Sequence, residues 1–448
     1  MKKPSLWVCV LLMIGYTAVT LFGGKWKKHS VIKSDAAGYY AYLSSGVVYH
    51  DVFKCKFYGH VDSLYNFGDG VYYYAVQYHP QTQNFYFKYN YGVALFEAPL
   101  FLVAHAITSL TGSYPADGYS DYYQLSVALS TVLFGFLGLL VSRKFLLKYF
   151  DEWVIAVCLL VIGAGTNFFA QVVTQPGLSH VYLFFVFACL LFVVQQAEET
   201  LRLKWFLLLG FTIGLVLVTR PVDIFVLVFP LVWLGVRLKE TDNAPYKAIA
   251  FALLIISVMV WLQLAYWKIA TGHWYFYTYK REHFNFSNWQ LLNGLFSFRK
   301  GWLVYSPLAL LGFLGTFFLW KHRKFRFYLL PFILYFFCVL YITFCWWQWY
   351  YGGSFGCRVL VESYAILAFP MSAFIQKVMV GRRSVAFAFG VIVVLLLMLN
   401  VFQTAQYSKG IIHWQKMNRE YYWRVFGKWS VSDKDKELLL KTEEIPQP

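Results

Sequence analysis

The stretch SDAAGYY, residues 34–40, follows the first long apolar run of the chain, LWVCVLLMIGYTAVTLF at residues 6–22. A run of about 17 to 25 apolar residues is long enough to cross a lipid bilayer as a helix. Asp35 therefore lies shortly beyond a predicted membrane helix, in a segment that is rich in lysine: Lys25, Lys27, Lys28 and Lys33. A carboxylate among lysines beside a membrane suggests chemistry on an anionic substrate that a lipid carries.

The composition excludes a soluble globular protein. The 448-residue chain is 59% hydrophobic and only 14% charged, and long apolar runs recur throughout it. Eleven runs approach the length of a membrane helix, at about residues 6–22, 125–141, 153–169, 181–195, 205–219, 222–236, 249–267, 302–320, 327–345, 359–375 and 384–402. The sequence thus predicts an all-α polytopic membrane protein with about eleven transmembrane helices and further helices at its outer surface.

Lysine and arginine gather in every second connection between these runs, and cytoplasmic loops are the ones that collect them. The N-terminus is then cytoplasmic, and the external segments are 25–121, 170–180, 268–301, 346–358 and 406–448. The run 92–112 is apolar enough to span the membrane. Spanning would invert every later loop, so we expect this run to lie as a helix at the outer surface.

The net charge of +17 comes mostly from these cytoplasmic loops, so no nucleic-acid partner is expected. The external lysines fit phosphate groups at the outer leaflet, with simple headgroup contact as the alternative. Residues 1–405 are expected to form one membrane domain, with 25–121 as its largest external part. Residues 406–448 are expected to form an external C-terminal tail.

Transfer of a sugar from a lipid phosphate to a hydroxyl needs a base for the acceptor proton and cations for the departing phosphate. Asp35 is the candidate base, and a helix-capping or turn carboxylate is the alternative. Lys88 precedes the predicted surface helix and can reach a phosphate at headgroup depth, although a snorkelling lysine would look the same.

Two arginines are candidates for the phosphate. Arg220 lies in Thr219-Arg220-Pro221, where two short apolar runs meet, so it sits below the outer surface and needs a partner. That partner is either Asp223 or a donor phosphate. Arg358 ends the sequence GGSFGCR at 352–358, in which glycines let the backbone approach a ligand and arginine can grip phosphate with two hydrogen bonds.

His180 ends the second external loop, as either a hydrogen-bonded polar residue or a ligand contact. The spacing of His, Cys, Asp and Glu is not that of a metal site, and no nucleotide-binding pattern is present. The activated substrate is therefore expected to be soluble in the membrane.

Several elements occur in a characteristic order along the chain: SDAAGYY at 34–40, Lys88-Tyr89, His180, Thr219-Arg220-Pro221, FSFRKGW at 296–302 with Ser306-Pro307, and GGSFGCR at 352–358. In this order they resemble the lipid-phosphate-sugar-dependent glycosyltransferases of the GT-C superfamily. The similar branch is the bacterial one, with protein O-mannosyltransferases and the aminoarabinose transferase of lipid A. The resemblance covers most of the chain.

The resemblance implies inverting transfer from a polyprenyl-phosphate sugar at the outer, periplasmic face of a bacterial inner membrane. Asp35 activates the acceptor, and the donor phosphate is bound by Lys88, Arg220 and Arg358. The expected substrate-binding residues are Tyr40, Tyr89, His180, Lys300 and Ser354. The acceptor is a protein, lipid A or a glycan.

The chain departs from many relatives at two positions. Ala36 and Phe87 stand where those relatives have acidic residues. We therefore predict that no metal and no other cofactor is required.

Two other functions remain open from the residues alone. A lipid-linked oligosaccharide ligase or polymerase would use a diphosphate donor and need a roomier cleft. A lipid-linked sugar transporter or flippase would place charges at mid-membrane, whereas the centres of these runs are nearly free of charge.

Overall fold

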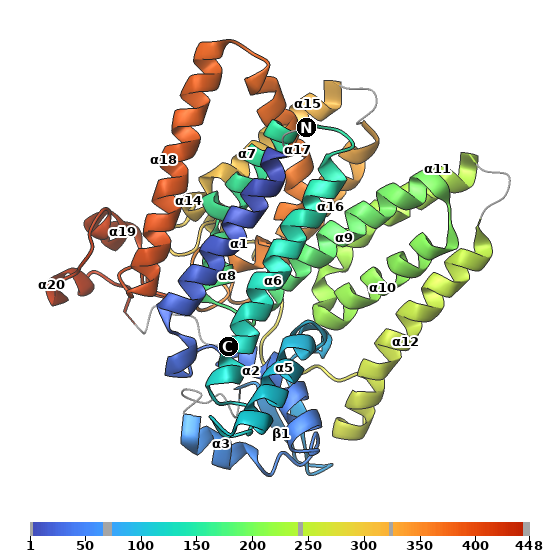
Figure 1. The fold of residues 1–448 in the computed structure, drawn as a ribbon, viewed down its shortest axis with the longest axis vertical. Coiled ribbons are helices and arrows are strands. Elements are labelled where there is room, and N and C mark those ends of the chain that lie inside the picture. Colours follow the sequence, from blue (N-terminus) through green and yellow to red (C-terminus); the bar gives the residue numbers. More distant parts are fainter. Residues whose placement is uncertain (1–2, 66–73, 241–244, 322–325, 442–448) are drawn as a thin grey trace.

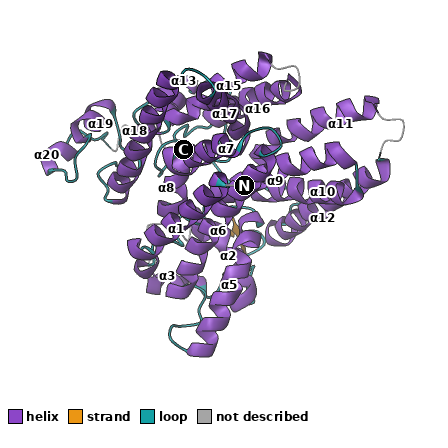
Figure 2. Cartoon of the chain, turned by 45° about the horizontal axis from the view of Figure 1, so that its top comes forward, coloured by secondary structure: helices purple, strands orange, loops and turns teal. Residues whose placement is uncertain are grey.

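The computed structural model describes residues 3–65, 74–240, 245–321 and 326–441. Long helices lie side by side in a bundle, and a lobe of shorter elements sits at one end of it (Figure 1). The amino-terminal end of the chain lies at the opposite end of the bundle. The fold class is therefore the helical membrane protein that the sequence predicts, as Figure 2 also shows.

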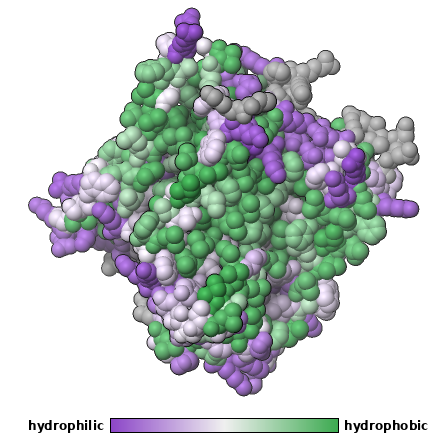
Figure 3. All heavy atoms as spheres, viewed as in Figure 1, coloured by the Kyte–Doolittle hydropathy of each residue, from purple (hydrophilic) through white to green (hydrophobic). Residues whose placement is uncertain are grey.

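Six helices in the described part of the chain are long and apolar enough to cross a membrane. They are α1 (Pro4–Gly23), α5 (Gly92–Thr111), α6 (Asp121–Leu146), α9 (Ser179–Thr200), α12 (Tyr246–Thr271) and α18 (Arg383–Ser408). The pair α7 (Glu152–Gly165) and α8 (Asn167–Thr174) forms a seventh candidate that is bent by 56°. Hydrophobic side chains cover the middle of the visible face, and hydrophilic atoms lie mainly around its edges (Figure 3).

Shorter apolar helices account for the other predicted runs. They are α10 (Leu203–Thr219), α11 (Val228–Glu240), α15 (Leu310–Lys321), α16 (Arg326–Phe344) and α17 (Tyr364–Met379). All eleven predicted runs fall on helical elements, but a count of eleven crossings is not confirmed. Prolines explain two of the interruptions, because Pro221 and Pro307 each begin a short 3-10 segment after a helix has ended.

The lobe contains α2 (Asp35–Leu43), α3 (Tyr58–Tyr65) and a hairpin that the all-helical expectation missed. Strands β1 (Val76–His79) and β2 (Asn84–Phe87) pair antiparallel. This aromatic stretch favours a strand because rings pack well on a pleated surface. Helix α5 lies with these elements at the end of the bundle in both Figure 1 and Figure 2.

The tail packs on the bundle through a separate apolar cluster. The tail carries the short helices α19 (Arg419–Val425) and α20 (Asp433–Lys436). Two other short helices, α13 (Leu291–Phe296) and α14 (Trp302–Tyr305), precede α15. Tyr421 and Tyr422 are buried against Tyr305 and Phe355, whereas Trp414 and Trp423 are more than half exposed. Residues 442–448 lie outside the described part.

One close approach sets the position of the site. A Cβ on Gly92, the first residue of α5, would lie 2.2 Å from Thr219 Oγ1 and 2.6 Å from the Val218 carbonyl oxygen. Glycine is therefore needed where α5 meets the end of α10. This contact brings the segment after β2, which carries Lys88, beside the joint that carries Arg220.

Candidate active site

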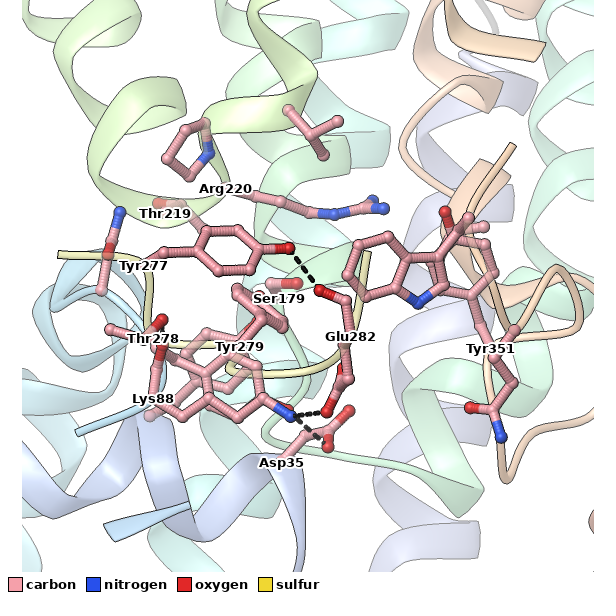
Figure 4. Close-up of a pocket in the computed structure, with 18 of the residues that line it drawn as sticks. Asp35, Lys88, Ser179, Thr219, Arg220, Tyr277, Thr278, Tyr279, Glu282 and Tyr351 are labelled. Atoms are coloured by element: carbon pink, nitrogen blue, oxygen red, sulfur yellow. Dashed lines mark hydrogen bonds and ion pairs between the residues drawn. The ribbon is translucent and has the colours of Figure 1, made fainter. Parts of the chain in front are cut away.

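A cavity of about 290 Å³ lies where the lobe meets the bundle. Its walls come from α2, the segment after β2, the start of α9, the end of α10, and the loops that follow α12 and α16. Asp35 and Lys88 lie on the lower side of the cavity in Figure 4, and Arg220 lies on its upper side. Arg358 also lines it, so the proposed base and the three proposed phosphate ligands meet at one space.

Asp35 is the first residue of α2, and both of its carboxylate oxygens have partners. The Tyr89 hydroxyl donates to Oδ1 at 2.7 Å, and Arg358 Nη2 lies 2.7 Å from Oδ2. Burial acts to raise the pKa of this carboxyl. The Arg358 guanidinium, the Tyr89 hydrogen bond and the Lys88 ammonium outweigh burial and hold the pKa of Asp35 below its usual value.

Arg358 is placed by a loop that other segments hold from several sides. Asn167 Nδ2 donates to the Cys357 carbonyl at 2.9 Å, and Gln175 Nε2 donates to the Gly353 carbonyl at 2.8 Å. The backbone next to Arg358 is thereby fixed. Its Nε–H is buried and has no hydrogen-bond partner among the described residues.

Lys88 is buried directly after β2 and pairs with a carboxylate from the loop after α12. Its Nζ lies 2.5 Å from Glu282 Oε1 and 3.8 Å from the centre of the Tyr74 ring. Thr278 Oγ1 donates to the Lys88 carbonyl at 2.6 Å, so the same loop is attached at a second point. Burial lowers the pKa of Lys88 below its usual value, although Glu282 acts in the opposite direction.

Arg220 lies at the joint between α10 and the 3-10 segment Pro221–Leu227, where its side chain faces two carboxylates. Glu362 Oε1 is 2.5 Å from its Nη1, and Asp223 Oδ1 is 3.6 Å away. The sequence pointed only to Asp223 as a protein partner. The other carboxylate oxygen of Glu362, Oε2, lies within hydrogen-bond distance of His180, 3.0 Å from its Nδ1. One buried carboxyl group therefore joins His180 to Arg220.

The predicted substrate-binding residues divide into two groups. Tyr89 and His180 line the cavity. Tyr40 is buried in the lobe, where its hydroxyl donates to the Gly118 carbonyl, and it packs on Phe101. Lys300 donates to the Ser354 carbonyl, and the Ser354 hydroxyl donates to the Gly356 carbonyl at 2.7 Å. Tyr40, Lys300 and Ser354 are not among the residues that line the cavity.

Sequence reasoning missed two acidic residues and most of the aromatic wall. Glu282 follows two basic residues in the loop after α12. Glu362 lies inside an apolar run, where a lone carboxylate signals a buried partner. Aromatic residues make up much of the lining: Tyr39, Tyr74, Trp267, Tyr275, Phe276, Tyr277, Tyr279, Phe284, Trp346 and Tyr351. Such rings offer flat apolar surfaces with polar edges, which suit the faces of a sugar.

Among the described residues, the two carboxylates that line the cavity are both engaged by protein cations. Asp35 and Glu282 are each paired with a cation. Within the described ranges, no group of three or more His, Cys, Asp or Glu residues could hold a metal ion. No step proposed below passes through a metal.

The architecture is that of the GT-C fold. Over its whole length the chain superimposes on the oligosaccharyltransferase of Archaeoglobus fulgidus, solved with a tethered acceptor peptide that contains the NVT sequon. The TM-score is 0.56 at 13% sequence identity, and the chain spans 60% of that protein. No family model and no curated protein matches the sequence.

Proposed function

We propose that the protein is a membrane glycosyltransferase that moves a sugar from a polyprenyl-phosphate donor to a hydroxyl acceptor, with inversion at the anomeric carbon. One observation carries this proposal: a carboxylate, Asp35, faces the same cavity as three cationic side chains, Lys88, Arg220 and Arg358. The GT-C fold, which the oligosaccharyltransferase of Archaeoglobus fulgidus also has, supports the assignment.

The proposed reaction is a single displacement. Asp35 takes the proton of the acceptor hydroxyl, whose oxygen forms a bond to the anomeric carbon on the face opposite the phosphate. The bond between that carbon and the phosphate oxygen breaks, and the phosphate leaves with the electron pair. Lys88, Arg220 and Arg358 stabilise the negative charge that develops on the leaving group.

The size of the cavity favours a small donor. Its volume of about 290 Å³ lies just below the roughly 300–1,000 Å³ range of small-molecule pockets. A single sugar on a monophosphate suits this space better than a long glycan on a diphosphate. The ligase alternative needs a larger cavity. The transporter alternative gains no support from the cavity, whose charged groups lie where the lobe meets the bundle.

The same arrangement supports a proposed location for the active site. The lobe lies at the end of the bundle opposite the amino-terminal end of α1 (Figure 1), and residues of the lobe line the cavity. Arg143 and Lys144 lie in the last turn of α6, a helix that starts at the lobe. Basic residues favour the cytoplasmic side. We therefore propose a periplasmic active site and C-terminal tail in a bacterial inner membrane, with a protein, lipid A or a glycan as the acceptor.

The test uses the full chain in lipid nanodiscs with radiolabelled donors. Undecaprenyl-phosphate hexoses and pentoses are compared with undecaprenyl-diphosphate sugars, using total periplasmic protein, lipid A and outer-membrane glycans as acceptors. Transfer from a monophosphate donor, undiminished by a chelator, is expected. Transfer only from diphosphate donors would favour the ligase, and donor movement across the bilayer without transfer would favour the flippase.

A further inference from the structure

Asp35 and Arg358 each have a second task in the proposed reaction, yet in the structure they are bound to each other. Arg358 Nη2 lies 2.7 Å from Asp35 Oδ2, and Tyr89 donates to Oδ1. A carboxylate that acts as a base must direct a lone pair at the acceptor hydroxyl. A guanidinium that grips the donor phosphate with two parallel hydrogen bonds directs those N–H groups at the phosphate. In the structure, Asp35 Oδ2 and Arg358 Nη2 are engaged with each other rather than with a substrate.

We propose that Arg358 has two successive partners: it covers Asp35 until the donor binds, and then turns to the donor phosphate and so exposes the base. This inference rests on the proposed function and adds an order to it. The donor binds first, and the acceptor is deprotonated only beside a bound donor.

The guanidinium has unused donors for a second anion. Arginine carries five N–H donors, and the Arg358 Nε–H is buried without a hydrogen-bond partner among the described residues. An oriented donor without a partner is costly in a buried position, so an incoming phosphate oxygen would be bound strongly there.

The backbone around Arg358 favours movement of the side chain alone. Lys300 holds the Ser354 carbonyl, and Asn167 holds the Cys357 carbonyl at 2.9 Å. Tyr89 is fixed against α2, because its ring stacks on Tyr39 with centroids 4.4 Å apart. Arg358 can therefore turn while the carboxylate keeps its orientation toward Tyr89.

The other charged groups around Asp35 leave Arg358 as its direct cationic partner. Lys88 is paired with Glu282, and Arg220 is paired with Glu362. The remaining titratable groups that face Asp35 are neutral phenols or an imidazole already bound to Glu362: Tyr39, Tyr74, Tyr89, Tyr279 and His180. Loss of the Arg358 contact therefore removes the largest attraction that keeps the carboxyl ionised.

The consequence is a base that strengthens when the donor arrives. An adjacent arginine lowers the pKa of an aspartate by about 1–3 units. When Arg358 moves to the phosphate, the pKa of Asp35 rises toward neutral pH, where a general base works best. The donor phosphate thus switches on the residue that activates the acceptor.

The test is a titration of Asp35 by carboxyl-region infrared difference spectroscopy on the full chain in nanodiscs. The Asp35→Asn variant identifies the Asp35 band. The probe is undecaprenyl phosphate without a sugar, and undecaprenol without phosphate is the control lipid. We expect undecaprenyl phosphate to raise the midpoint of the Asp35 titration by about 1–3 pH units and undecaprenol to leave it unchanged.

Arg358→Gln should raise that midpoint without any lipid and abolish most of the response to undecaprenyl phosphate. Arg358→Lys serves as a second variant if the glutamine form does not fold. Arg299→Gln is the matched control, because Arg299 is a buried arginine outside the cavity lining, stacked 3.5 Å from the centre of the Tyr350 ring. In the Arg299→Gln variant, the midpoint of the Asp35 titration should equal that of the unmodified chain.

Two negative results have different meanings. If undecaprenyl phosphate binds but leaves the Asp35 midpoint where it was, the two-partner role of Arg358 is wrong and the glycosyltransferase proposal stands. If undecaprenyl phosphate does not bind and no donor supports transfer, the proposed function fails and this inference fails with it.

Discussion

Ion pairs lie at both ends of the bundle, and they are arranged differently. At the amino-terminal end, Arg143 Nη2 lies 2.5 Å from Glu152 Oε1 and its Nε donates to Ser5 Oγ at 2.6 Å. These three residues join the start of α1, the end of α6 and the start of α7. At the lobe end, Asp35, Lys88 and their partners surround a cavity of about 290 Å³.

The difference separates a structural ion pair from a candidate catalytic one. The groups at Arg143 bond to one another and tie three helices together. The groups at the cavity pair with one another but also face a space lined by aromatic rings. An ion pair that can exchange one partner for a substrate is a candidate for function, whereas an ion pair enclosed by helices contributes mainly to stability.

The largest expected effect comes from Asp35→Asn. Loss of a general base should reduce the transfer rate by about 10²- to 10⁴-fold. Donor affinity should stay the same or improve, because Arg358 loses its anionic competitor for the phosphate. Initial rates and undecaprenyl-phosphate binding by the same nanodisc preparation measure both quantities. Undiminished turnover by this variant would show that another group takes the proton.

Lys300→Met should have a smaller effect, acting through Arg358. The variant leaves the Ser354 carbonyl without its donor, so the loop that carries Arg358 is held less firmly. We expect the KM for the donor to rise by about tenfold, which corresponds to about 1.4 kcal/mol of lost binding, with a smaller change in kcat. The measurement is donor-dependent initial rates on folded protein.

A double variant distinguishes positioning from direct contact at Lys300. If Lys300 acts through Arg358, adding Lys300→Met to Arg358→Gln should not raise the donor KM further. A further rise of the same size would indicate that Lys300 binds the substrate itself, as the sequence predicted.

Glu282→Gln should change the pH dependence of donor binding. Burial lowers the pKa of Lys88, and the Glu282 carboxylate raises it. Without that carboxylate, Lys88 loses its proton at a lower pH. The fall in donor affinity on the alkaline side should therefore begin about one pH unit lower. Donor KM measured from pH 7 upward tests this shift, and an unmoved alkaline limb would mean that Lys88 does not bind the phosphate in its charged form.

Glu152→Gln should have the smallest effect on transfer, because its ion pair lies at the far end of the bundle. It weakens the contacts that Ser5 and Arg143 make, at a cost of about 1–3 kcal/mol of stability. The thermal midpoint should fall while the transfer rate per folded molecule stays unchanged. Loss of turnover in fully folded protein would mean that the two ends of the bundle are coupled.

The candidate site could be predicted in part from the sequence. Asp35 stood out as a carboxylate among lysines, and Lys88, Arg220 and Arg358 stood out as cations beside apolar runs. Their partners did not stand out, since Glu362 lies inside such a run and Glu282 in a basic loop. Lys300 and Ser354 show the opposite problem. A polar residue in a glycine-rich loop has the same sequence signature whether it binds a ligand or a neighbouring carbonyl.

The sequence by itself determined the class of protein and the position of its helices. Burial of apolar side chains and hydrogen bonding along a helix are properties of contiguous residues, so apolar runs and prolines such as Pro221 and Pro307 are sufficient. The tertiary structure decided which charges meet. Asp35 is positioned by the packing of α2 against α5. Arg358 is positioned by the loop before it, whose backbone other segments hold. Contacts between residues so distant in the chain depend on how helices pack, which no local pattern encodes.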